Sequence, residues 1–142
     1  MKVIKFGGTS VANSNAIKSV FNIIKKNQDK TLIVVSALSG VTDNLSSMID
    51  LAVEGDNSYI KKLKYLKKRH VDLINESLDI KSQKKLIIFL HAKINEIKDL
   101  LTSIESLGES TNKSYSRILS YGEILSSSVI YEILKHNKLN LV

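Results

Sequence analysis

The chain of 142 residues contains no cysteine and no proline. Without cysteine it can have no disulfide framework, no thiolate nucleophile and no cysteine zinc site. It has no apolar run of about 18 residues or more, and its first residues lack a secretory signal pattern, so we predict a cytoplasmic protein that does not contact a membrane. The sequence also offers no proline-rich or low-complexity linker, which predicts one folded unit, either a whole domain or part of one.

Histidine and aromatic residues are scarce too. His70, His91 and His136 lie far apart and form no metal-binding motif, so we interpret them as solvated or partly buried structural residues and expect no metal site. The net charge is +7, with lysines clustered in residues 61–70 at helical spacing with leucine. The solvated face of a helix explains this cluster better than polyanion binding, because no nucleic-acid-binding motif accompanies it. We therefore predict no nucleic-acid partner.

Hydrophobic patterning predicts a βαβ unit at the start of the chain. Residues 2–6 form a short strand, and a helix begins near residues 13–14, where a polar side chain can cap it. Residues 31–36 are a continuous β-branched run, typical of a strand buried on both faces of a parallel sheet. A loop over residues 37–44 and a short helix over residues 45–53 follow.

The rest of the chain is predicted to be mostly helical. One helix starts near residues 57–58 and a second has an apolar face over residues 86–104, so we expect the two to pair as a hairpin. A polar connector at residues 108–114 leads to a last helix that ends near His136. The final residues, 139–142, are predicted to begin a third strand.

The first predicted strand runs into two adjacent glycines, Gly7 and Gly8, followed by Thr9 and Ser10. At the carboxyl end of a parallel strand, glycines let the backbone approach a bound group, and successive amides can bind an anion such as phosphate. Lys5 can project toward the same place. A tight turn that needs glycine is the simpler explanation for a bare glycine pair, and the pattern matches neither the dinucleotide nor the P-loop motif.

Three stretches resemble, in order, those of aspartate kinases (aspartokinases) of the amino-acid-kinase superfamily. They are KFGGTSV at residues 5–11, VVSALSGVTD at residues 34–43 and ILSYGEILSS at residues 118–127. The segment GDNSYIKKLKYLKKRH, residues 55–70, is similar to the helical insert of this family, although it is less specific.

The resemblance implies an α/β fold of the amino-acid-kinase type. This is a three-layer αβα sandwich with a mostly parallel sheet and a helical hairpin insert over the substrate side. Residues 1–142 would form the N-terminal half only of the catalytic domain, as one unit truncated at its C-terminal end. The resemblance leaves open whether the intact chain is monofunctional or a bifunctional aspartokinase/homoserine dehydrogenase, and which amino acid inhibits it.

Aspartate kinases transfer the γ-phosphoryl group of ATP to the side-chain carboxylate of L-aspartate. The product is 4-phospho-L-aspartate, in the first step toward lysine, threonine and methionine. The acceptor is already ionised at pH 7, so no general base is needed. Mg²⁺ would arrive with ATP. The resemblance also implies a homo-oligomer for the full-length protein and an inactive fragment for this chain alone, because the adenine-binding loops and the substrate arginine have no match in it.

The resemblance assigns the phosphate side of the site to the first stretch. Lys5 would be the catalytic cation between the phosphates and the acceptor carboxylate. The transferred phosphate would be bound by Lys5 and by the amides of Gly7, Gly8, Thr9 and Ser10, as an oxyanion hole binds developing charge.

The other two stretches would recognise the amino acid. Ser36 and Thr42 match positions that line the aspartate pocket, and Glu123 matches the glutamate that faces the ammonium group of the substrate. Without the resemblance, a solvent-facing helix glutamate is the better explanation for Glu123. We interpret Lys113 and Arg117 as surface charges.

Two other functions stay open. The chain could be a catalytically inert fragment that binds aspartate or another protein without turnover. It could also belong to a sister enzyme that phosphorylates glutamate, carbamate or a nucleotide, which substrate competition would separate from an aspartate kinase.

Overall fold

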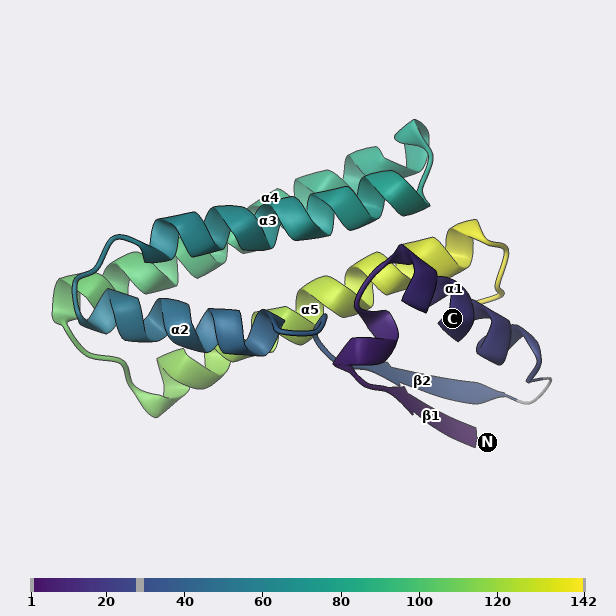
Figure 1. Cartoon of the computed structure of the whole chain (residues 1–142), viewed down its shortest axis with the longest axis horizontal. Helices are drawn as coiled ribbons and strands as arrows, with labels where there is room; N and C mark the ends of the chain where they lie inside the picture. The colour runs from purple at the N-terminus through teal and green to yellow at the C-terminus, as the bar shows by residue number, and fades with distance from the viewer. Residues whose placement is uncertain (1, 28–29, 142) are drawn as a thin grey trace.

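A computed structural model describes residues 2–27 and 30–141, and helices dominate it (Figure 1). Within these residues the two strands form a parallel pair in which Lys5 lies opposite Val34 and Phe6 opposite Val35. The predicted βαβ unit is therefore confirmed. The elements are β1 (Lys2–Phe6), the 3₁₀ helix η1 (Gly8–Val11), α1 (Ser14–Lys25), β2 (Thr31–Val35), α2 (Val41–Val53), α3 (Tyr59–Ser77), α4 (Ile80–Leu107) and α5 (Asn112–His136).

The strand pair is covered on one face only. Phe6 is buried, and Ile4, Ile33 and Val35 pack beside it against the hydrophobic core. Side chains alternate between the faces of a strand, and the opposite face is open: Val3 is 59% exposed, Leu32 52% and Val34 39%. The prediction that residues 31–36 are buried on both faces is therefore wrong for this chain, because the described residues supply helices to one face alone. The three-layer sandwich stays a prediction.

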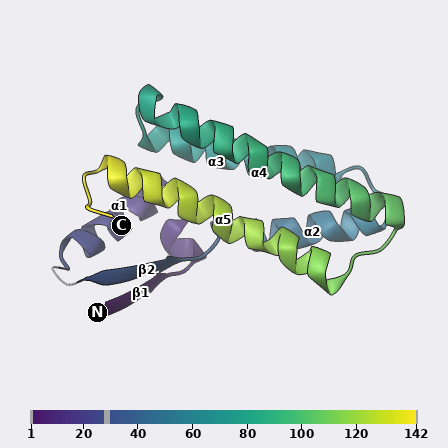
Figure 2. The ribbon, with the colours of Figure 1, turned by 180° about the vertical axis from the view of Figure 1, so that it is seen from behind.

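Helices α3 and α4 form the predicted hairpin. They lie along one another in both views, and α5 contacts this hairpin as well as β2 (Figures 1 and 2). No helix among the described residues is long and apolar enough to cross a membrane. The face of α3 that lies in the core consists of Leu63, Leu66, His70, Leu73 and Ile74. Because His70 is fully buried, its interpretation as a solvated or partly buried residue is wrong.

Two helices begin before the predicted residue. α2 begins at Val41, inside the predicted loop, while α4, for which only an apolar face was predicted, begins at Ile80. α5 begins inside the predicted connector, because the Thr111 hydroxyl accepts a hydrogen bond from the Ser114 amide and the Ser114 hydroxyl accepts one from the Thr111 amide. This reciprocal cap starts a helix without apolar residues in its first turn. Periodicity alone therefore missed it.

The predicted third strand is wrong for residues 139–141, which have no strand structure, and residue 142 lies outside the described part. The N–H group of Leu139 donates to the carbonyl oxygen of Leu134 at the end of α5, over 3.2 Å. This backbone group therefore closes a helix rather than joining a sheet.

Candidate functional site

The carboxyl ends of β1 and β2 meet at the same edge of the strand pair, as parallel strands require. The Ser36 N–H donates to the Phe6 carbonyl oxygen over 3.1 Å, and the Ser39 N–H donates to the Gly8 carbonyl oxygen over 3.2 Å. These bonds hold residues 6–8 against residues 36–39. Two of the three stretches singled out in the sequence are thus side by side.

The third stretch, on α5, joins them at Ala37. The Ala37 N–H donates to the Glu123 carboxylate oxygen Oε1 over 3.3 Å, and the Ser126 hydroxyl donates to the Ser36 carbonyl oxygen over 2.7 Å. Glu123 is exposed, as the simpler explanation required, yet it also anchors the loop that follows β2. The structure therefore brings Ser36 and Glu123 together.

Two glycines allow this close approach. A Cβ atom at Gly8 would lie 2.9 Å from the Ala37 carbonyl oxygen, and one at Gly122 would lie 2.9 Å from the Ala37 Cβ atom. Both distances are too short for non-bonded atoms. Gly8 thus has a packing reason, which differs from the tight-turn explanation because its φ is not positive. A Cβ atom at Gly7 would meet nothing within 4 Å.

The predicted phosphate-binding residues lie at the start of η1. Thr9 and Ser10 are exposed, and the Ser10 N–H already donates to the Gly7 carbonyl oxygen over 3.0 Å. The amides of Gly8 and Thr9 open the 3₁₀ helix, so they have no acceptor within it. Of the four predicted amides, that of Ser10 is therefore already bonded, while those of Gly7, Gly8 and Thr9 have no backbone acceptor among the described residues.

Lys5 and Thr42 are less closely joined to the other residues. Lys5 is exposed on the open face of β1, and its ammonium group makes no hydrogen bond or ion pair within the described residues. Thr42 is exposed in the first turn of α2, two residues after Gly40. Within the described residues neither side chain makes a hydrogen bond or ion pair with Glu123.

Arg69 was missed by the sequence analysis, which interpreted its lysine-rich segment as a solvated helix face. Its guanidinium group donates to the carbonyl oxygen of Ser39 and, over 3.3 Å, to that of Ala12. The side chain thus crosses from α3 to both loops of the site. The signals in the sequence were an arginine among lysines and the pair Arg69-His70 at the end of the segment that resembles the helical insert.

A polar cluster at Tyr121, two residues before Glu123, holds α5 against α4. The Tyr121 hydroxyl donates to Glu96 over 2.6 Å, and the Lys93 ammonium donates to the other oxygen of the same carboxylate over 2.8 Å. Hydrogen bonds from Lys93 and then Tyr121 hold the pKa of the Glu96 carboxyl below its usual value. Burial, followed by the hydrogen bond to Glu96, raises the pKa of Tyr121. The cluster therefore holds together as an ionised carboxylate with a neutral tyrosine at neutral pH.

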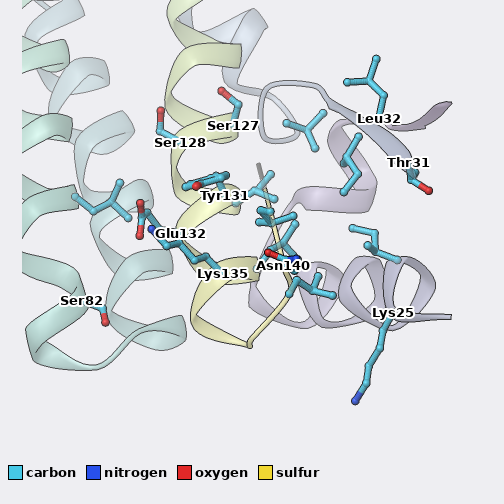
Figure 3. A pocket seen from close by; sticks show the side chains of 18 of the residues that line it. Lys25, Thr31, Leu32, Ser82, Ser127, Ser128, Tyr131, Glu132, Lys135 and Asn140 are labelled. Carbon is cyan, nitrogen blue, oxygen red and sulfur yellow. The ribbon is translucent and has the colours of Figure 1, made fainter. Parts of the chain in front are cut away.

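A separate open groove lies beside β2 (Figure 3). Residues from α1, β2, α4, α5 and the segment after α5 line it, including Leu32, Tyr131 and Asn140. None of the residues predicted to bind ATP or aspartate is among the described residues that line it. The groove and the Ala37 junction are therefore different places.

Among the described residues no three histidine or acidic side chains lie together as a metal site would require.

Comparison with known proteins identifies the family. The model of the amino acid kinase family matches residues 1–142. The chain belongs to the amino acid kinase family. It is 31% identical over 139 residues to bifunctional aspartokinase/homoserine dehydrogenase 1, chloroplastic, of Arabidopsis thaliana, with 97% of this chain and 15% of that protein covered. It is also 31% identical over 139 residues to the aspartokinase of Chlamydia muridarum, with 98% of this chain and 28% of that protein covered.

Solved structures of the family share the fold. E. coli aspartokinase III in complex with lysine and aspartate superposes with a TM-score of 0.86 at 22% identity, over 99% of this chain and 30% of that chain. The same enzyme in complex with aspartate and ADP gives the same values. Aspartate kinase from Clostridium acetobutylicum gives a TM-score of 0.69 at 24% identity, over 95% and 29%. The α/β fold with a parallel sheet is thus confirmed, and this amino acid kinase chain spans less than a third of the length of each of these relatives.

Proposed function

We propose that the polypeptide containing this chain is an aspartate kinase. The observation that carries the proposal is the junction at Ala37, where Gly8, Ser36 and Glu123 come together from three distant stretches of sequence. These are the stretches that resemble aspartate kinases, and relatives named aspartokinase match nearly the whole chain. The reaction transfers the γ-phosphoryl group of ATP to the side-chain carboxylate of L-aspartate and gives 4-phospho-L-aspartate.

The phosphate side of the junction would neutralise and align the transferred group. Lys5 would supply positive charge between the phosphates and the acceptor carboxylate, while the amides of Gly8 and Thr9 donate to the phosphoryl oxygens. Phosphoryl transfer asks mainly for positioning and electrostatic stabilisation, so these groups suffice without a general base. One such donor contributes about 3 kcal/mol to transition-state stabilisation in comparable sites. Gly7 and Ser10 would shape this segment.

The other side of the junction would recognise aspartate. Glu123 has a second carboxylate oxygen beside the one that accepts from Ala37, and it would accept a hydrogen bond from the ammonium group of the substrate. The hydroxyls of Ser36 and Thr42 would donate to its carboxylates. Glu123 at the ammonium group and Lys5 at the acceptor carboxylate would thus favour aspartate over analogues whose side chain is neutral.

Cofactor, location and assembly complete the proposal. ATP would bring Mg²⁺ with it, since the described residues offer no carboxylate cluster for a resident ion. We propose a cytoplasmic homo-oligomer for the whole protein. The chain by itself would be inactive, because it spans 28% of the C. muridarum aspartokinase that it matches.

The proposal is tested by presenting the complete polypeptide with Mg·ATP and a panel of acceptors. Hydroxylamine traps an acyl phosphate as a hydroxamate, so product formation can be followed directly. We expect hydroxamate from L-aspartate and at least about tenfold less from L-glutamate at equal concentration, since an added methylene moves the acceptor carboxylate out of line. Product from glutamate or carbamate and none from aspartate would assign a sister enzyme. ADP release without any acceptor product would also contradict the proposal.

A further inference from the structure

The guanidinium group of Arg69 reaches from α3 to two backbone segments far from it in the sequence. It donates to the carbonyl oxygens of Ser39 and Ala12. Ala12 directly follows η1, and Ser39 lies between β2 and α2. A single side chain therefore bonds to both segments that carry the proposed substrate-binding residues.

The same two segments also contact each other through their backbones. The Ser39 N–H donates to the Gly8 carbonyl oxygen, while the Ser39 carbonyl oxygen accepts from Arg69. Ser39 is thus held from both sides. Among the described residues, removing Arg69 would leave one backbone hydrogen bond between residues 7–12 and 36–40, from the Ser39 N–H to the Gly8 carbonyl oxygen.

Arginine has the chemistry for this position. Its planar guanidinium group keeps its charge and directs N–H groups toward two different acceptors, whereas a lysine ammonium is a single point of charge. Within the described residues no carboxylate lies at ion-pair distance from Arg69. The neighbouring Lys68 differs, since it pairs with Asp72 on the exposed side of the helix. The charge of Arg69 therefore stays uncompensated by any described carboxylate, beside a site that would bind two anions.

We infer that Arg69 is a positioning residue that holds the phosphate-side segment, residues 7–12, in register with the aspartate-side segment, residues 36–40. The inference rests on the proposed aspartate kinase activity. The donors of Arg69 bond to backbone carbonyls, so it acts on the reaction through the two loops and touches no reacting atom. Its loss should lower kcat more than it weakens either substrate, because in-line transfer depends on the separation of the two loops.

Kinetics of the complete polypeptide test the role. Arg69→Lys keeps the charge but loses the planar guanidinium group that donates to two acceptors, and Arg69→Gln loses both the charge and that group. Lys68→Ala removes a neighbouring charge and serves as the control. We expect Arg69→Lys to lower kcat by about tenfold and Arg69→Gln by roughly a hundredfold, since a displacement of about 1 Å has effects of that size. The KM values for aspartate and ATP should change by less than about threefold. Added guanidinium ion should partly restore Arg69→Gln, and Lys68→Ala should match the wild type.

Hydrogen exchange measures the loops independently of activity. In both Arg69 variants, peptides covering residues 7–12 and 36–40 should exchange faster together, while peptides from the middle of α4 keep the wild-type rate. Wild-type kcat in Arg69→Gln would overturn the inference, as would faster exchange in one segment alone or a uniform rise across the chain. If the wild type phosphorylates no aspartate, the proposed function fails, and the exchange result still decides whether Arg69 joins the two segments.

Discussion

Lys5 is the side chain on which the proposed chemistry depends most. It is exposed on β1 and bonds to no described residue, so its removal should leave packing intact. Lys5→Ala should therefore lower kcat by roughly 10²-fold or more, with a nearly unchanged free energy of unfolding. Steady-state kinetics and chemical denaturation of the same preparation measure both. The control is Lys2→Ala, on the same strand, where the ammonium bonds to Asn27. Equal activity in the two variants would remove Lys5 from the site.

Glu123 has two separable roles, as loop anchor and as proposed partner of the substrate ammonium. Glu123→Gln keeps an oxygen for the Ala37 amide but removes the charge. We expect the KM for aspartate to rise by roughly tenfold or more, because a hydrogen bond to a charged group contributes about 1.5–3 kcal/mol. The KM for ATP should stay unchanged. Glu132→Gln, on the same helix, serves as the control, and an unaltered KM for aspartate in Glu123→Gln would contradict the assignment.

His70 makes the stability of the chain depend on pH. It is fully buried, its Nδ1–H group donates to the Leu66 carbonyl oxygen over 2.8 Å, and Nε2 has no partner among the described residues. Burial lowers the pKa of His70 below its ordinary value, with Arg69 acting in the same direction and the Leu66 bond against it. The unfolded chain therefore binds the proton more readily, and the contribution of His70 is complete above about pH 6.5 and is lost as the pH falls below it.

Denaturation at several pH values tests this account of His70. The free energy of unfolding should fall between about pH 7 and pH 5, with a smaller slope in His70→Gln than in the wild type. His91→Gln, at an exposed position, should keep the wild-type slope. Identical slopes for the wild type and His70→Gln would refute it.

At the scale of elements, the site depends on how closely α5 approaches the loop after β2. Gly122 lies against Ala37 with no room for a Cβ atom, although it lies within a helix, where alanine is otherwise favoured. Gly122→Ala should therefore destabilise the fold by about 1–3 kcal/mol through overpacking. Ser120→Ala, at an exposed position of the same helix, is the matched control. A Gly122→Ala protein more stable than the wild type would contradict this account, because it would show that Ala37 can move to make room for the added methyl group.

The sequence predicted the existence of elements better than their ends. Parallel strands and a helical hairpin followed from β-branched runs and from apolar spacing, since both signals reflect burial. The first turn of α5 escaped because its cap, Thr111 with Ser114, carries no hydrophobic signal, whereas α2 begins after Gly40 without a side-chain cap. Arg69 escaped for a related reason: its partners are backbone carbonyls, which no pattern of side chains reveals.

At the scale of the molecule, three stretches meet at the carboxyl ends of the two strands, although the first and the last are more than a hundred residues apart in the sequence. The resemblance predicted which stretches matter, and the structure places Gly8, Ser36 and Glu123 around Ala37. The open face of β2 could not be predicted from TLIVVS, because such a run records apolar character and not the number of layers that cover it. The resemblance gives no distances, so it could not reveal the hydrogen bond that the Ala37 N–H donates to the Glu123 carboxylate.

One measurement tests the central claim, that the Ala37 junction binds the substrates. Amide NMR spectra of the complete polypeptide, isotopically labelled within residues 1–142 and titrated first with L-aspartate and then with Mg·ATP, report on each segment separately. The account predicts that aspartate shifts the signals of Ser36, Ala37 and Glu123, and that Mg·ATP shifts those of residues 7–10. Shifts confined to the groove beside β2, or no shifts with either ligand, would contradict it.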